Sequence, residues 1–169
     1  GDAYGYHLGA GPPALNTRGK YSFTSDGNGV DAGDLSLARM SASGAQSATH
    51  GYCAGGSNGN GVGNTIDKFV FSVEATSTDV GDLTTTGSDG PAGQSSETYG
   101  YACGGASPYF DVIDKYPFAT DTNATDVGNL LLARYVTDSG TSSETHGYTA
   151  GGGYPYSNVI QKFSFTTDG

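Results

Sequence analysis

The chain contains no tryptophan, one methionine and only two cysteines in 169 residues. Basic residues are also scarce, since seven Lys and Arg stand against 17 Asp and Glu and give a formal charge of −10. Binding to phosphates requires a basic patch, so this composition argues against a nucleic-acid partner. Anionic lipid surfaces should repel the chain as well. No apolar run approaches the roughly 20 residues that span a bilayer, so we expect no membrane segment.

The two cysteines are expected to be small buried thiols. Cys53 and Cys103 lie one and two residues after equivalent tyrosines, so on alternating strands their side chains point to opposite faces. A disulfide needs Cα atoms within about 7 Å, and equivalent strands of successive units should lie farther apart than that. A bridge or a metal site is the alternative.

Glycine is abundant, with 29 residues, and Ser, Thr, Asp and Asn fill most of the space between short apolar runs. Strong helix formers are rare. This mixture is typical of many short strands that are joined by tight turns. The composition therefore predicts an all-β fold, and the length favours one domain over residues 1–169.

Two short sequence motifs recur along the chain. Tyr-Cys-Ala-Gly-Gly at 52–56 returns in altered form at 101–105 and 148–152, with a degenerate copy at 6–10. Ile-Asp-Lys-Phe-Val-Phe at 66–71 returns at 113–118 and 160–165, with a degenerate copy at 18–23. The equivalent lysines are residues 20, 68, 115 and 162, which are 48, 47 and 47 positions apart. A fixed period near 50 indicates a propeller or an array, in which each unit is covered by its neighbours.

Each unit is predicted to hold four short antiparallel strands. In unit 39–86 a run after Arg39 reaches a turn at 44–47, and strands follow at 49–54, 65–73 and 79–83. Unit 87–133 repeats this plan, while 1–38 and 134–169 are partial units. Because the chain opens at the second strand of one unit and ends after the third strand of another, it holds about three and a half repeats. A fragment, an oligomer that completes a ring and a compact four-bladed ring are all open.

The repeat resembles the kelch repeat. The Gly-Gly doublet that closes an apolar strand, an aromatic residue about 13 positions later and an arginine before the next unit carry this resemblance. Arg39 and Arg134 match the family's arginine, which Gly87 replaces in the middle unit, and Val80 and Val127 stand in for its missing tryptophan. The family's tyrosine position is held by Tyr21, Phe69, Tyr116 and Phe163. The resemblance implies a kelch-like β-propeller of four-stranded antiparallel blades.

The sequence motifs of the repeats, such as Thr-His-Gly-Tyr and Asp-Val-Gly-Asp-Leu, are also similar to those of kelch-like repeats in marine phage and environmental surface proteins. This resemblance implies an extracellular or virion-surface location. A homo-oligomer that completes the propeller ring is a further expectation.

The loops after the glycine doublets vary most between units, and variable loops on a constant scaffold are typical binding sites. Four aromatic residues in these loops suit stacking on a sugar ring or contact with a protein surface. The alternative is that they fold back onto the neighbouring blade. The predicted ligand-binding residues are Tyr109, Phe110, Tyr154 and Tyr156.

Other polar residues are expected to be structural. His50 and His146 share one repeat position and should hydrogen-bond to backbone. The repeated lysines should pair across strands with Asp31, Asp79 or Asp126, although a lysine ring for an anion is the alternative. Turn acids and amides around 26–34 and 121–126 are explained by Asx turns, with calcium binding as the alternative.

A glycosidase would need two carboxylates about 5–9.5 Å apart, whereas the acids here recur as parts of the repeat. We therefore assign no catalytic residue, no cofactor and no metal. The sequence favours a non-enzymatic recognition or structural module that binds a glycan or protein. A carbohydrate-active enzyme, or a fragment of one, is the alternative, and a purely architectural repeat is a third.

Overall fold

The structure is a computed structural model that describes residues 3–61, 63–86, 89–106, 108–136, 139–153 and 156–168. The described residues form strands and turns, and none of them is helical. Accordingly, no described segment is a helix that could cross a membrane. The all-β prediction is confirmed.

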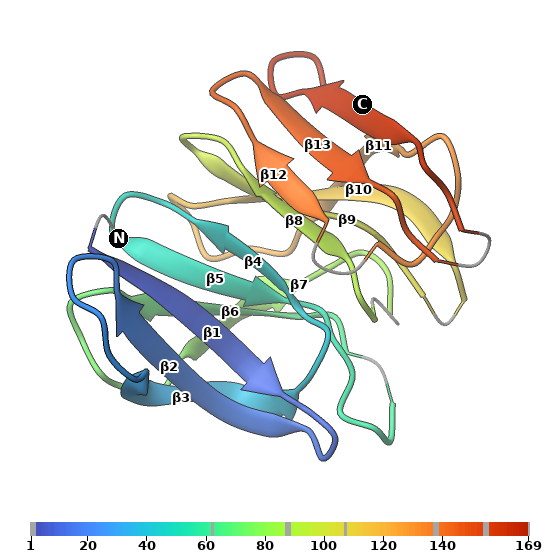
Figure 1. Cartoon of the computed structure of the whole chain (residues 1–169). Coiled ribbons are helices and arrows are strands. Elements are labelled where there is room, and N and C mark those ends of the chain that lie inside the picture. The colour runs from blue at the N-terminus through green and yellow to red at the C-terminus, as the bar shows by residue number, and fades with distance from the viewer. Residues whose placement is uncertain are drawn as a thin grey trace.

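The strands form four antiparallel sheets that follow one another along the chain (Figure 1). The first sheet consists of β1 (Tyr4–Ala10), β2 (Leu15–Ser22) and β3 (Val30–Arg39). The second consists of β4 (Ser43–Gln46), β5 (His50–Ala54), β6 (Thr65–Val70) and β7 (Thr78–Asp82). The third consists of β8 (Ala92–Ser95), β9 (Tyr99–Gly105), β10 (Phe110–Pro117) and β11 (Thr125–Asn129). The fourth consists of β12 (Gly140–Ser142), β13 (His146–Ala150) and β14 (Ile160–Ser164).

The four sheets are versions of one unit. Each sheet pairs its strands in chain order, and β5, β9 and β13 occupy the second position, as β1 does in the repeat. The first sheet has three strands because its described residues contain no counterpart of β4. The fourth has three because its described residues contain no counterpart of β7.

The predicted turn at 44–47 is wrong, because residues 43–46 form β4. This strand pairs with β5, with Gly44 opposite Cys53 and Gln46 opposite Gly51. Its small residues are required by packing rather than by a turn. A Cβ on Gly93 of β8 would meet the backbone of Gly44, so the two strands approach each other at their glycines.

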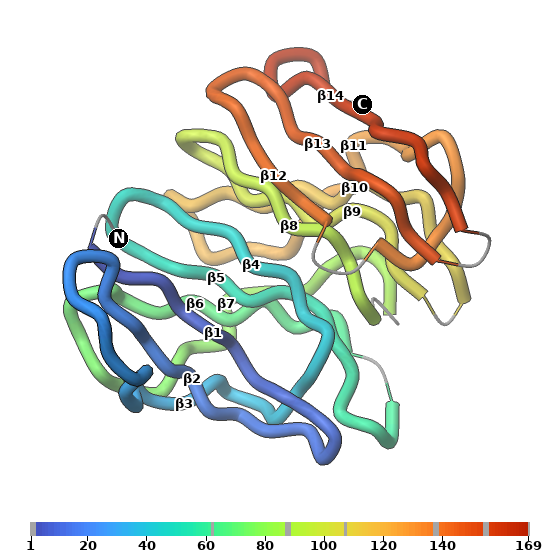
Figure 2. Tube along the Cα trace, viewed as in Figure 1, coloured from blue at the N-terminus to red at the C-terminus, as the bar shows by residue number. Residues whose placement is uncertain are grey.

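The first strands β4, β8 and β12 lie side by side and are called the inner strands here. Hydroxyl groups link them: the Gln46 N–H donates to Ser95 Oγ at 2.8 Å, and the Ser95 N–H donates to Ser142 Oγ at 2.9 Å. The sheets spread outward from these strands in an open row, with β1–β3 at one end and β12–β14 at the other (Figures 1 and 2).

The core lies between the sheets. One buried cluster joins the second and third sheets through Ile66, Leu83 and Tyr116, and another joins the third and fourth through Ile113, Leu130 and Phe163. Burial of each large apolar side chain contributes about 1.5–3 kcal/mol. Cys53 and Cys103 are free and fully buried, as predicted.

One aromatic arrangement recurs at each junction between successive sheets. A tyrosine on the second strand of one unit stacks on a phenylalanine of the next sheet, and a second aromatic ring of that sheet lies tilted against it. The stacked pairs are Tyr6–Phe71, Tyr52–Phe118 and Tyr101–Phe165, with ring centroids 5.2, 4.6 and 4.9 Å apart. The tilted pairs are Tyr6–Phe69, Tyr52–Tyr116 and Tyr101–Phe163, at 5.4, 5.9 and 5.3 Å. Such pairs contribute about 0.5–1.5 kcal/mol beyond burial.

Candidate functional site

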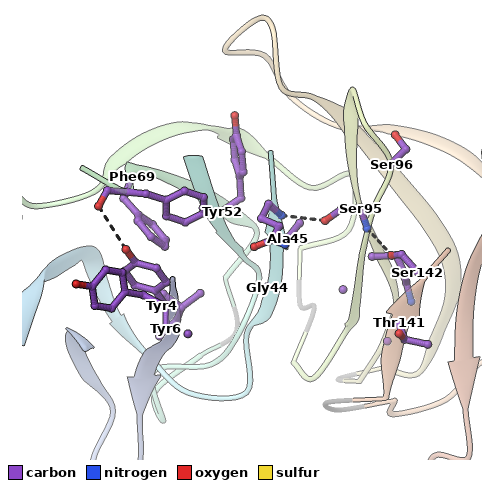
Figure 3. Close-up of a pocket in the computed structure, with 18 of the residues that line it drawn as sticks. Tyr4, Tyr6, Gly44, Ala45, Tyr52, Phe69, Ser95, Ser96, Thr141 and Ser142 are labelled. Atoms are coloured by element: carbon purple, nitrogen blue, oxygen red, sulfur yellow. Dashed lines mark hydrogen bonds between the residues drawn. The ribbon is translucent and has the colours of Figure 1, made fainter. Parts of the chain in front are cut away.

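A groove of about 650 Å³ lies between β1 and the inner strands (Figure 3). Among the described strands, β1 pairs with β2 alone, whereas β5, β9 and β13 each pair with an inner strand. The edge of β1 that no described strand pairs with lies along the groove, where its backbone donors and acceptors are available to a ligand. The volume is in the range of sites that hold small ligands.

Aromatic rings form one wall of the groove. Tyr4 and Tyr6 extend from β1, and Tyr52, Phe69 and Phe71 come from the second sheet and the turn after β6. Their packing is fixed by the junction between the sheets, where the Tyr6 hydroxyl donates to the Phe71 carbonyl at 3.3 Å. Tyr4 remains 43% exposed, and the Lys20 ammonium lies 5.3 Å from the centre of its ring. This wall therefore offers an accessible ring face next to a rigid aromatic cluster.

Hydroxyl and amide groups form the opposite wall. Ser95 ends β8 and Ser96 follows it, Thr141 and Ser142 lie on β12, and Figure 3 shows them across the groove from the aromatic rings. Ser95 and Ser142 are held by the hydrogen bonds between inner strands, so their positions are fixed by backbone. Thr141 and Gln46 of β4 are exposed. No described residue that lines the groove is charged.

Burial keeps Tyr52 of the groove wall, and Tyr101 and Cys53 in the core, in their neutral forms. Desolvation raises the pKa of Tyr52 to about 12 and that of Tyr101 to about 12. It also raises the pKa of the Cys53 thiol to about 12. Because a thiolate rather than a thiol is the nucleophile, Cys53 is suited to packing and not to attack on a substrate.

The predicted loop aromatics lie elsewhere. Tyr109 is 46% exposed in the turn before β10, and Phe110 is half-buried where that strand starts. Tyr156 is 82% exposed, and Tyr154 lies outside the described residues. None of the three described residues lines the groove. They stay a prediction of a second, separate binding surface.

A smaller cavity of about 190 Å³ lies beside the loop that follows Gly55-Gly56. Asn58 and Asn60 line it together with Arg39. The Arg39 guanidinium is already used within the fold, since it bonds to Asp67 and to two backbone carbonyls. This cavity therefore offers a ligand mainly amide and backbone groups.

The predicted partners of the lysines are wrong. Each of three lysines pairs with an acid of the next unit: Lys20 with Glu74, Lys68 with Asp121 at 2.8 Å and Lys115 with Asp168 at 2.7 Å. The acids that the sequence suggests as partners instead accept N–H groups two residues later in their own turns. These are Asx turns, the expected use of turn acids, and they are Asp31–Gly33, Asp79–Gly81 and Asp126–Gly128.

The two repeated histidines have side-chain partners rather than the predicted backbone ones. His50 Nδ1 lies 2.8 Å from Thr49 Oγ1, and His146 Nδ1 lies 2.9 Å from Thr145 Oγ1. The threonine that precedes each histidine reaches the ring because both side chains lie at the start of the strand. Within the described part of the chain, no group of three or more His, Cys, Asp or Glu residues is placed to hold a metal.

The groove escapes sequence analysis because its polar wall belongs to strands whose small residues predict a turn. A signal is present nonetheless. Short runs of Gly, Ala, Ser, Thr and Gln recur at one repeat position, at 43–46, 92–95 and 139–142. Recurrence of small residues at equivalent positions favours closely packed strands over turns.

The comparisons with known proteins add no relative. A scan against protein-family models found no match for this chain, and a search of curated proteins found none either. The resemblance to the kelch repeat therefore stays a prediction from the sequence.

Proposed function

We propose that this protein is a non-enzymatic recognition module that binds a neutral glycan in the groove along its inner strands. The observation that carries this proposal is the composition of the groove, in which aromatic rings face a row of hydroxyl groups with no charged residue among the described lining. Sugar rings present apolar C–H faces and a rim of hydroxyl groups. An aromatic wall and a hydroxyl wall match these two features.

The fold that we propose is a kelch-like β-propeller, with each sheet as one blade. It is supported by the repeat near 47 residues, by sheets paired in chain order and by inner strands that lie together. In a propeller the first strands of the blades line the central axis, which would make the groove part of the central channel. An extracellular or virion-surface location agrees with a glycan ligand and is proposed on the resemblance alone.

The charge distribution favours binding over glycoside hydrolysis. A glycosidase uses two carboxylates that flank the scissile bond. Although the chain has 17 Asp and Glu, none of the described groove-lining residues is one of them. Several acids are committed to pairs between units, as with Asp121 and Asp168.

The test is a glycan array followed by calorimetry with the strongest hit. Tyr4→Ala removes one of the exposed rings that line the groove and should raise the dissociation constant up to about tenfold, since an aromatic contact contributes about 0.5–1.5 kcal/mol. Thr141→Val keeps the side-chain shape but removes a hydroxyl, and a smaller loss of affinity is expected.

Tyr99→Ala is the matched control, because Tyr99 holds the repeat position of Tyr4 and also lies under a lysine, Lys115 at 4.3 Å, but does not line the groove. A Tyr109→Ala/Tyr156→Ala double variant tests the loop surface in the same assay. Loss of affinity in this variant alone would move the site to the loops. Product formation from any bound glycan would overturn the non-enzymatic proposal. Absence of binding to every glycan on the array would overturn the glycan proposal.

A further inference from the structure

The junction between successive sheets is repeated three times within the chain, and each end of the chain presents one half of it. A complete junction has an aromatic part and a charged part. In the aromatic part, a tyrosine of one sheet packs against two rings of the next. In the charged part, a lysine of one sheet pairs with an acid of the next unit. The two parts lie three residues apart in sequence, since every unit reads Lys, then Phe three residues later, then Asp or Glu three residues after that.

The outward side of the first sheet, which we call the near face, carries the receiving half. Tyr21, Phe23 and Asp26 occupy the repeat positions of Phe69, Phe71 and Glu74. Phe69 is 5% exposed inside its junction, whereas Tyr21 is 45% and Phe23 is 62% exposed. No described residue pairs with Asp26, and the two rings lie against each other, with centroids 5.8 Å apart.

The outward side of the fourth sheet, the far face, carries the complementary half. Tyr148, Ile160 and Lys162 occupy the positions of Tyr101, Ile113 and Lys115. Ile113 is 1% exposed within the core, but Ile160 is 73% exposed. Lys115 is paired with Asp168, while no described residue pairs with Lys162. The two faces lie at opposite ends of the row of sheets (Figure 1).

We infer that the far face of one copy of this chain binds the near face of a second copy, head to tail. Tyr148 of one copy would pack against Tyr21 and Phe23 of the other, and Lys162 would pair with Asp26. The occupant is identified by the junctions inside the chain, which show what covers each half and with which charges. A head-to-tail contact closes a ring when its rotation divides a full turn and otherwise forms a filament.

The complementary charges allow a specific test by sedimentation velocity over a concentration series. The wild-type chain should form species larger than one copy. Lys162→Glu places two carboxylates opposite each other at the contact, and Asp26→Lys places two ammonium groups there, so each variant alone should associate at least about tenfold more weakly. An equimolar mixture of the two variants offers a contact with no like charges, in which the unchanged Asp26 of one copy meets the unchanged Lys162 of the other. Association of unlike copies should therefore recover.

Two further variants complete the design. Phe23→Ser removes an exposed ring and should abolish assembly while the circular dichroism spectrum and the unfolding midpoint stay unchanged. Glu97→Lys is the matched control, because it changes the net charge as Asp26→Lys does but lies in the exposed turn before β9. A wild-type chain that stays monomeric at all concentrations overturns the inference. So does an assembly that ignores these substitutions, or one that the mixture does not rescue.

Discussion

A buried arginine occurs at the same repeat position before the second sheet and before the fourth, but only the first of the two has hydrogen-bond partners among the described residues. Arg39 is 4% exposed, and its Nη2 donates to Asp67 Oδ2 at 2.7 Å, while Nη1 donates to the carbonyls of Gly55 and Thr65 at 3.0 and 2.9 Å. Arg134 is 1% exposed at the equivalent position beside the fourth sheet, yet its three guanidinium nitrogens have no hydrogen-bond partner among the described residues. Gln161 stands where the carboxylate of Asp67 would be expected.

The third sheet holds the converse case. Gly87 replaces the arginine in the sequence, and the buried Asp114 accepts hydrogen bonds from the Thr84 N–H at 3.0 Å and the Thr84 hydroxyl at 2.6 Å. Burial raises the pKa of Asp114. The three units therefore show an ion pair, an acid without its arginine and an arginine without its acid.

One interaction is common to all three. The side chain at this position accepts a backbone N–H of the segment that enters from the preceding sheet. The three bonds are Ser36 N–H to Asp67 at 3.0 Å, Thr84 N–H to Asp114 at 3.0 Å and Leu131 N–H to Gln161 at 2.6 Å. All three units therefore place an oxygen acceptor at this position, because a buried N–H without a hydrogen bond destabilises the fold. The ion pair with arginine occurs in only one of the three units.

The largest effect is expected for Arg39→Met. This substitution leaves the Asp67 carboxylate, which is 0% exposed, without its cation, and breaking a buried pair in this way costs about 3–5 kcal/mol. Chemical denaturation measures the loss. Adding Asp67→Asn should recover part of it, because the amide oxygen still accepts the Ser36 N–H. A loss below about 1 kcal/mol would show that the Asp67 charge does not depend on Arg39 in the folded chain.

The converse change, Gln161→Asp, should stabilise the fourth sheet. It supplies the missing carboxylate to Arg134 and keeps an oxygen that accepts the Leu131 N–H, so we expect a gain of about 2–3 kcal/mol in the free energy of unfolding. Gln161→Asn is the control for side-chain length. In an Arg134→Met background the same Gln161→Asp change should destabilise, and the double-mutant cycle isolates the pair. An equal effect in both backgrounds would mean that Arg134 does not reach this position.

The repeat itself could be predicted from the sequence, because Gly-Gly doublets and equivalent aromatic residues mark strand ends and packing positions at a fixed period. The strands at 49–54, 65–73 and 79–83 correspond to β5, β6 and β7, although β6 ends at Val70. The inner strands could not be recognised in this way. Their Gly, Ala and Ser residues favour a turn locally, and only contact between strands of different sheets, as between Gly44 and Gly93, explains them.

The candidate site was less predictable than the fold, for the same reason. Side chains in the groove come from β1, β8 and β12, which lie far apart in sequence and meet only when the sheets are placed side by side. The lysine partners were missed because Lys68 and Asp121 belong to different units, so a cross-strand rule within one sheet selected Asp79. Pairing between repeats becomes visible only when the repeats are packed.

The smallest change in the free energy of unfolding is expected for Asp114→Asn. This variant tests whether a buried acid without an arginine behaves differently from Asp67, which has one. The amide oxygen can accept the Thr84 hydrogen bonds, so the constant interaction persists without a buried charge. Because burial raises the pKa of Asp114, protonation favours the folded wild-type chain. That contribution is fully present below about pH 3.8, the ordinary value, and is lost as the pH rises through the raised folded pKa.

The variant lacks this titration, so its stability relative to wild type should increase from acid towards neutral pH and then level off. The gain should not exceed about 1 kcal/mol, the scale of one buried hydrogen bond. Urea denaturation of both proteins across this range gives the difference directly. Asp67→Asn is the matched comparison and should destabilise, because it removes the partner of Arg39. If Asp114→Asn loses stability relative to wild type as the pH rises, the Asp114 carboxylate has a cation that balances it, and the distinction between the two units fails.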